Sequence, residues 1–176
     1  VTLSDNGWVR GTDSAKVTLT EFADFQCPAC KAYNPLVLEV LKNYQDKGLR
    51  LVFKHFPLTS HKNAFSAAMA AEAVGAQGKF FEMHDILYEK QDEWAQVSAI
   101  EAQEKFISYA AGLKLDKEKF LKDLSEKALE EKIRANQDEV ISNGVSGTPT
   151  FFINGKKIEN PSTLSQFSKL IDKALK

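Results

Sequence analysis

The chain has 176 residues, of which 43% are hydrophobic and 27% charged, and its formal net charge is −1 at pH 7. This composition is typical of a globular domain and excludes a disordered chain, and without a basic excess we expect no nucleic-acid partner. A transmembrane helix is also excluded, because the densest apolar stretch, residues 49–58, is short and contains charged residues.

The first third of the chain predicts a strand, a helix and a second strand. Residues 1–16 are polar and turn-rich, with room for a short strand at 8–10, and residues 17–25 alternate in polarity as a strand does. A helix is predicted from Pro28 to about Lys47, kinked by Pro35, and residues 49–56 predict the second strand. This unit should be a parallel, right-handed crossover.

The remainder predicts a run of helices and then a hairpin. Residues 61–143 carry apolar residues three and four apart, and within their charged last stretch Ser125 is a candidate cap for a separate helix. Residues 149–153 predict a strand, Asn154-Gly155 a two-residue hairpin turn, and residues 162–175 a final helix. We expect a small mixed sheet flanked by helices, with residues 1–60 and 144–176 forming one domain and residues 61–143 inserted into it.

Cys27 and Cys30 are the only cysteines in the sequence. A bridge between them closes almost no loop and stabilises little, which favours a chemical role. Cys27 stands just before the predicted helix, where the free N–H groups of Ala29 and Cys30 and the helix dipole favour a thiolate, while Pro28 wastes no N–H group. Cys27 is therefore the candidate nucleophile, and Cys30, one turn into the helix, should be shielded by packing.

Three other uses of the two cysteines compete with a redox role. A zinc site would need ligands from His55, His61 and His84, none of which form a close pair at zinc-finger spacing, so no metal site is expected. A covalent haem site requires His after the second cysteine, where this chain has Lys31. Two core thiols acting as small hydrophobic residues remain an alternative.

The stretches "EFADFQCPACK" and "GVSGTPTFFING", together with Pro35, resemble the thioredoxin superfamily. The helical block between the strands is similar to that of its DsbA-type branch. The likeness runs from about residue 8 onward and implies an α/β thioredoxin-like fold and a protein disulfide oxidoreductase that needs no cofactor. It also implies that Cys27 is the attacking and attacked sulfur and Cys30 the resolving one.

The same resemblance implies roles for further residues. Pro149 would be a cis-proline opposite the cysteines, and an extended substrate segment would bind at Thr148, Pro28 and Ala29. Glu21 would be a buried acid beneath the site that takes and returns the proton of Cys30, with Lys54 as its basic companion. The alternative for Glu21 is a solvated position at a sheet edge.

One position departs from the most oxidising members, which have His before the second cysteine where this chain has Ala29. Without that group Cys27 should be less acidic and the disulfide less oxidising, so the direction of electron flow stays open.

We expect a monomeric extracytoplasmic oxidase, in the periplasm or at the cell surface, whose leader has been removed. Its partners would be unfolded or partly folded proteins with free thiols and a membrane-embedded redox protein similar to DsbB. The alternatives are a thiol reductase of the same fold and a Cu(I)-binding or chaperone module that uses both cysteines as ligands.

Overall fold

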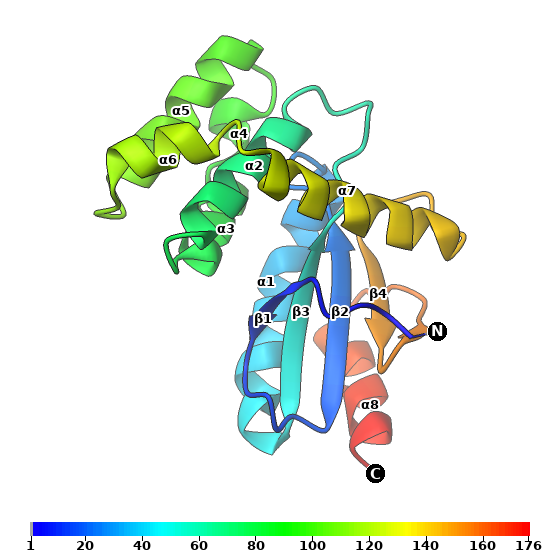
Figure 1. Cartoon of the computed structure of the whole chain (residues 1–176). Coiled ribbons are helices and arrows are strands. Elements are labelled where there is room, and N and C mark those ends of the chain that lie inside the picture. Colours follow the sequence, from blue (N-terminus) through cyan, green and yellow to red (C-terminus); the bar gives the residue numbers. More distant parts are fainter. Residues whose placement is uncertain (1) are drawn as a thin grey trace.

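The computed structural model describes residues 2–176 and is built around a five-stranded sheet with the order β1-β3-β2-β4-β5 (Figure 1). Strands β2 and β3 are parallel, and the other three pairings are antiparallel, so the sheet is mixed, as the sequence predicts. The strand bounds are Trp8–Arg10 (β1), Val17–Ala23 (β2), Leu49–His55 (β3), Thr150–Ile153 (β4) and Lys156–Lys157 (β5).

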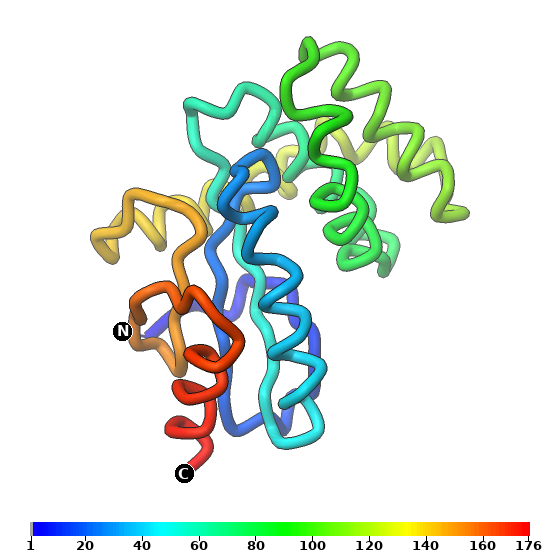
Figure 2. Tube along the Cα trace, turned by 180° about the vertical axis from the view of Figure 1, so that it is seen from behind, coloured from blue at the N-terminus to red at the C-terminus, as the bar shows by residue number. Residues whose placement is uncertain are grey.

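Two helices, α1 (Pro28–Tyr44) and α8 (Leu164–Leu175), cover one face of this sheet (Figure 2). Their apolar faces pack against the alternate residues of β2 and β3 that point to that side, among them Val17, Leu19 and Leu51. A short 3-10 helix, η1 (Gln45–Lys47), extends α1, and Gly48 then turns the chain with a φ of 101°, a conformation that glycine adopts without strain. This packing fixes where the start of α1 lies relative to the sheet.

The other helices gather at the end of the sheet where β2 and β3 finish (Figure 1). They are α2 (Ala64–Gly75), α3 (Phe80–Glu89), α4 (Gln91–Trp94), α5 (Ala99–Ala111), α6 (Lys117–Asp123) and α7 (Lys127–Ser142). The charged last stretch does form two helices, but Ser125 is not the cap: α7 begins after Glu126, and the Ser125 hydroxyl donates to the carbonyl of Lys122. The division into a domain and an insertion stays a prediction.

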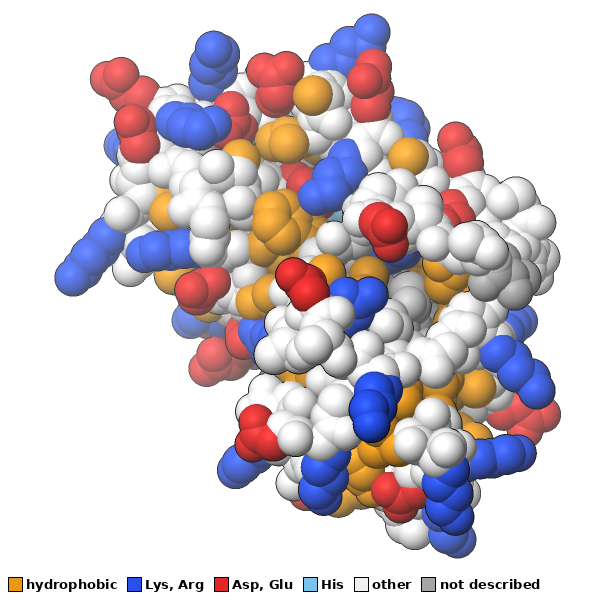
Figure 3. All heavy atoms as spheres, turned by 60° about the horizontal axis from the view of Figure 1, so that its bottom comes forward, with side chains coloured by type: hydrophobic (Ala, Val, Ile, Leu, Met, Phe, Trp, Pro, Cys, Tyr) orange, Lys and Arg blue, Asp and Glu red, His pale blue; other side chains and the backbone are white. Residues whose placement is uncertain are grey.

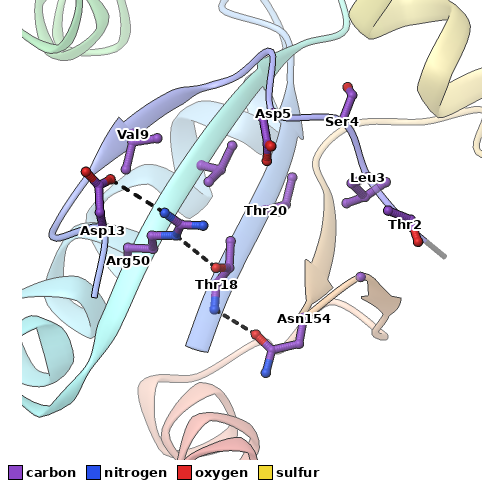
Figure 4. A pocket seen from close by; sticks show the side chains of 12 residues that line it. Thr2, Leu3, Ser4, Asp5, Val9, Asp13, Thr18, Thr20, Arg50 and Asn154 are labelled. Atoms are coloured by element: carbon purple, nitrogen blue, oxygen red, sulfur yellow. Dashed lines mark hydrogen bonds and ion pairs between the residues drawn. The ribbon is translucent and has the colours of Figure 1, made fainter. Parts of the chain in front are cut away.

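The predicted hairpin turn is confirmed, because both Asn154 and Gly155 have positive φ angles. The side-chain oxygen of Asn154 also accepts the N–H of Thr18 at 2.8 Å, which fastens the hairpin to β2 (Figure 4). The hollow of about 680 Å³ seen in that view lies on the sheet face opposite α1 and is lined by the segment 2–5 and by Arg50. It contains neither cysteine.

Charged side chains of both signs are spread over the face drawn in Figure 3, in keeping with the small net charge. From residue 2 to residue 176, no helix combines the length and the apolar character that crossing a membrane requires.

Candidate active site

Cys27 is the N-cap residue of α1, with extended backbone angles, and Pro28 occupies the first helical position. Its side chain lies at the surface end of the helix: Pro28 and Ala29 are exposed, Cys27 is 6% exposed, and Cys30 is fully buried. Both cysteines are free thiols in this structure. At the helix start the Cys27 sulfur therefore lies near the surface, whereas the Cys30 sulfur lies in the interior.

The pKa of Cys27 is lowered from 9.0 to about 5. The largest cause is a hydrogen bond from the Cys30 thiol. The Thr148 side chain and the backbone N–H groups of Cys30 and Ala29 lower the pKa further, and burial opposes them. The two backbone N–H groups are donors that a helix N-terminus leaves without intrahelical partners. Cys27 is consequently a thiolate at neutral pH.

Cys30 behaves in the opposite way. Burial raises its pKa well above the ordinary value, and the neighbouring Cys27 and Glu21 charges raise it further, while the backbone N–H of Asp24 lowers it. Two cysteines separated by one helical turn thus differ in protonation at neutral pH. The asymmetry assigns the nucleophile to the outer sulfur.

The Thr148–Pro149 peptide bond is cis, as the resemblance implies. The Thr148 carbonyl oxygen lies 3.5 Å from the Cys27 sulfur, so the loop before β4 faces the start of α1 directly. Side chains on both sides fasten this loop: Asn160 donates to the Pro149 carbonyl at 2.8 Å, and the Thr150 hydroxyl donates to the Gly147 carbonyl at 2.8 Å.

Glu21 lies on the face of β2 that points towards α1, and it is 1% exposed. The alternative of a solvated edge position is therefore wrong. Burial raises its pKa from 4.5 to about 8, and its Oε1 atom has no hydrogen-bond partner among residues 2–176. A carboxyl group that is largely protonated at neutral pH thus lies close enough to affect the Cys30 thiol.

Lys54 is not the companion of Glu21. In the parallel pairing Lys54 is opposite Phe22, whereas Glu21 is opposite Phe53, so the two side chains point to opposite faces of the sheet. The Lys54 amino group instead forms an ion pair with Glu139 of α7 at 2.5 Å. The prediction for Lys54 is wrong, because the resemblance does not specify the register between β2 and β3, and that register decides which side chains share a face.

Two buried amide side chains near the cysteines are not predicted from the sequence. Gln91 donates to the Phe25 and Cys27 carbonyls at 2.7 and 3.1 Å, and Gln26 donates to the Ala95 carbonyl at 2.6 Å. The backbone N–H of Asn63 in turn donates to the Gln26 side chain at 2.7 Å. These bonds tie the loop before α1 to α4 and to the start of α2, and no local spacing in the sequence signals them.

The histidines take part in carboxylate pairs. His55 lies 2.8 Å from Glu72, and His84 lies 2.8 Å from Asp85. His61 is paired with Asp24 at 2.7 Å, close to the active-site loop. Within the described part of the chain, no group of three or more His, Cys, Asp or Glu residues is arranged to hold a metal ion.

Sequence comparisons relate the chain to proteins of two kinds. A thioredoxin family model matches residues 3–173. A Na(+)/H(+) antiporter NhaA 3 from Salinispora tropica is 39% identical over 168 residues, and an antiporter NhaA 1 from Salinispora arenicola is 37% identical over 171 residues. These alignments cover 95% and 97% of this chain but 24% and 25% of the relatives, so the chain spans about a quarter of the length of the curated relatives it matches.

Solved structures share the whole architecture. BdbD from Bacillus subtilis is 27% identical with a TM-score of 0.84, over 97% of this chain and 93% of its own. A thioredoxin-like oxidoreductase from Silicibacter pomeroyi is 25% identical with a TM-score of 0.80, over 97% and 93%. The fold of α-DsbA1 from Wolbachia pipientis superposes with a TM-score of 0.86 at 23% identity, over 98% and 92%. The chain belongs to the thioredoxin family.

Proposed function

We propose that this protein is an extracytoplasmic thiol oxidase that transfers the Cys27–Cys30 disulfide to client proteins. The observation that carries the proposal is the pKa of Cys27, which is lowered to about 5. A stabilised thiolate stabilises the reduced enzyme, and a disulfide whose reduced form is stabilised is a strong oxidant. The supporting hydrogen bonds come from Cys30, Thr148 and the helix start, so the low pKa does not depend on a histidine between the cysteines.

The reaction begins when a client thiolate attacks the Cys27 sulfur of the disulfide. A client–Cys27 disulfide forms, the bond to Cys30 breaks, and Cys30 leaves with the electron pair. A second client thiolate then attacks the client sulfur of this mixed disulfide, and Cys27 leaves as a thiolate. The client gains a disulfide, and the enzyme keeps two electrons as a dithiol with one proton on Cys30.

The opposite pKa shifts of the two cysteines favour this direction. Thiols of low pKa leave more readily, so Cys27 is a good leaving group when the second client thiolate attacks the mixed disulfide. Cys30 retains its proton, because its pKa is well above the ordinary value, and a protonated thiol does not attack the mixed disulfide. Client resolution is therefore favoured over return of the electrons to the client.

Glu21 would supply and recover the proton of Cys30. Its pKa of about 8 leaves the carboxyl group largely protonated at neutral pH, and its Oε1 atom is free of other hydrogen bonds. A buried acid of this kind can protonate the departing Cys30 thiolate and take the proton back when the dithiol is reoxidised.

The surroundings of Cys27 suit an extended polypeptide. The exposed Pro28 and Ala29 lie on one side of the sulfur, and the Thr148 backbone lies on the other, where it would bind a client segment as an added strand. The clients would be unfolded or partly folded proteins with free thiols. A membrane-embedded redox protein similar to DsbB would reoxidise the enzyme, which would act as a monomer.

Equilibration with glutathione buffers of known ratio tests the direction. We expect the disulfide to be reduced by mildly reducing buffers; persistence under strongly reducing conditions would instead support a reductase. With a reduced unfolded client, Cys27→Ala should abolish turnover. Cys30→Ala should accumulate mixed disulfides with a client that carries a disulfide, because the Cys27 thiolate attacks that disulfide, releases one client thiolate and has no neighbouring enzyme thiol to resolve the product; gel electrophoresis without reductant detects them. If Cys30→Ala accumulates none, the assignment of the two sulfurs is wrong.

A further inference from the structure

A buried carboxylate lies beside the cysteines and takes no part in the exchange reaction. The side chain of Asp24, three residues before Cys27, is fully buried and accepts three hydrogen bonds. The donors are the backbone N–H groups of Gln26 at 2.7 Å and Leu58 at 2.9 Å, and the Nδ1 atom of His61 at 2.7 Å. His61 is the only one of these partners that can carry a charge.

The backbone of Asp24 contacts both cysteines. Its carbonyl oxygen accepts the N–H of Cys27 at 3.1 Å, and its N–H group acts on the Cys30 thiol. A carboxylate in this position is a like charge for the Cys27 thiolate, and like charges close together disfavour ionisation. The same charge reaches Tyr88 of α3, together with those of Cys27, Cys30 and Glu21.

His61 is placed to offset that charge. It lies in the loop between β3 and α2, its side chain is 24% exposed, and its ring reaches inward to the Asp24 carboxylate. An Nδ1–H group donates to the carboxylate whether or not the ring is protonated, and the protonated ring adds a positive charge.

We propose that His61 is a positioning residue that sets the acidity of Cys27, and hence the oxidising strength of the disulfide, by neutralising Asp24. The inference rests on the proposed function, because it concerns the same thiolate. Loss of the His61 side chain would leave the Asp24 charge uncompensated, whereas loss of the Asp24 carboxylate would remove that charge. The two losses should shift the acidity of Cys27 in opposite directions.

The test compares His61→Ala, His61→Gln and Asp24→Asn with the wild-type protein, all in the reduced state. The ultraviolet absorbance of the thiolate is followed against pH, and the equilibrium with glutathione is measured on the same samples. Lys62→Gln is the matched control, since Lys62 is adjacent in sequence, exposed and bonded to the Gln96 carbonyl at 3.4 Å. Circular dichroism and urea unfolding establish that each variant is folded.

At a pH close to the wild-type midpoint we expect about a twofold smaller thiolate fraction in His61→Ala and about a twofold larger one in Asp24→Asn. His61→Gln, which keeps an N–H donor, should lie between His61→Ala and the wild type, and Lys62→Gln should match the wild type. The glutathione equilibrium should follow, with His61→Ala less oxidising and Asp24→Asn more oxidising.

A purely structural pair would move both variants in the same direction or change only their unfolding, and either result overturns the inference. A wild-type protein in which Cys27 ionises only at the pH of an ordinary thiol would overturn the proposed function instead. The two failures are therefore distinguishable in one set of titrations.

Discussion

Glu72 and Glu21 are both buried carboxyl groups with 1% of their surface exposed, yet they lie in different surroundings. Glu72 of α2 accepts hydrogen bonds from Trp8 and from His55, and it forms an ion pair with Lys132 at 3.0 Å. Burial alone would raise its pKa, but these partners lower it below the ordinary value. Glu21 has an oxygen without a partner, and burial raises its pKa to about 8.

The difference separates a carboxylate that holds the fold from one that is available for chemistry. The partners of Glu72 come from β1, β3 and α7, so this residue joins the helices to the sheet as a compensated charge. Glu21 lies beneath Cys30, and its Oε1 atom accepts no hydrogen bond from another of the described elements. A buried acid with an unused proton is costly for stability and useful only where a proton must move.

Replacing Glu72 by Ala should cause the largest loss of stability. It would leave His55, Lys132 and Trp8 without their acceptor, and removing one partner of a buried ion pair typically costs about 3–5 kcal/mol. Urea unfolding of the reduced protein measures this free energy. Glu130→Ala is the control, because Glu130 pairs with Arg134 on the surface of α7, where such pairs contribute about 0.5 kcal/mol. Equal losses in both variants would contradict the structural role of Glu72.

Glu21→Gln should stabilise the protein in a pH-dependent manner. A pKa raised from 4.5 to about 8 means that the contribution of this carboxyl group is fully present below pH 4.5 and is lost as the pH rises to about 8. From pH 5 to pH 8, the wild type should therefore lose stability relative to Glu21→Gln, on the order of 3 kcal/mol. Urea unfolding at several pH values in this range gives the difference.

This comparison needs a background without the Cys27 thiol, for which Cys27→Ser serves. The pKa of Cys27 is lowered from 9.0 to about 5, so its contribution is present above pH 9 and is lost as the pH falls through about 5. In the reduced wild type the two contributions have opposite slopes and partly cancel. If the stability difference due to Glu21→Gln stays flat with pH in the Cys27→Ser background, Glu21 is not the buried acid described above.

The sequence predicts the elements of this molecule better than its long-range contacts. Alternation in residues 17–25, the Asn154-Gly155 turn and the cysteines at a helix start are local patterns, and each corresponds to the structure. The pairing of Asp24 with His61 joins residues 37 positions apart and leaves no periodic trace. The cap of α7 differs from the prediction because Ser125 bonds back to Lys122 instead of forward into the helix.

The face on which Lys54 lies could not be fixed from local pattern for a similar reason. Alternation along β3 indicates that Lys54 and Phe53 point to opposite faces of the sheet. Only the register with β2 determines which of the two shares a face with Glu21. A shift of one residue in that register would exchange them. The burial of Glu21, in contrast, follows from its place among the apolar residues of its own strand.

Lys54→Met should change the free energy of unfolding less than Glu72→Ala or Glu21→Gln does, and it should leave the cysteine site unaffected. The amino group of Lys54 pairs with Glu139 and donates to the Ser4 carbonyl at 2.6 Å, so its loss removes a link between β3, α7 and the N-terminal segment. Because the Glu139 side chain keeps 14% exposure to water, we expect a loss of about 2 kcal/mol, less than for a fully buried pair. The thiolate titration of Cys27 and the pH-dependent difference due to Glu21→Gln should stay unchanged, since Lys54 lies on the other face of the sheet. A shift in either measurement would mean that Lys54 acts on Glu21 after all, and that the two carboxyl environments are not independent.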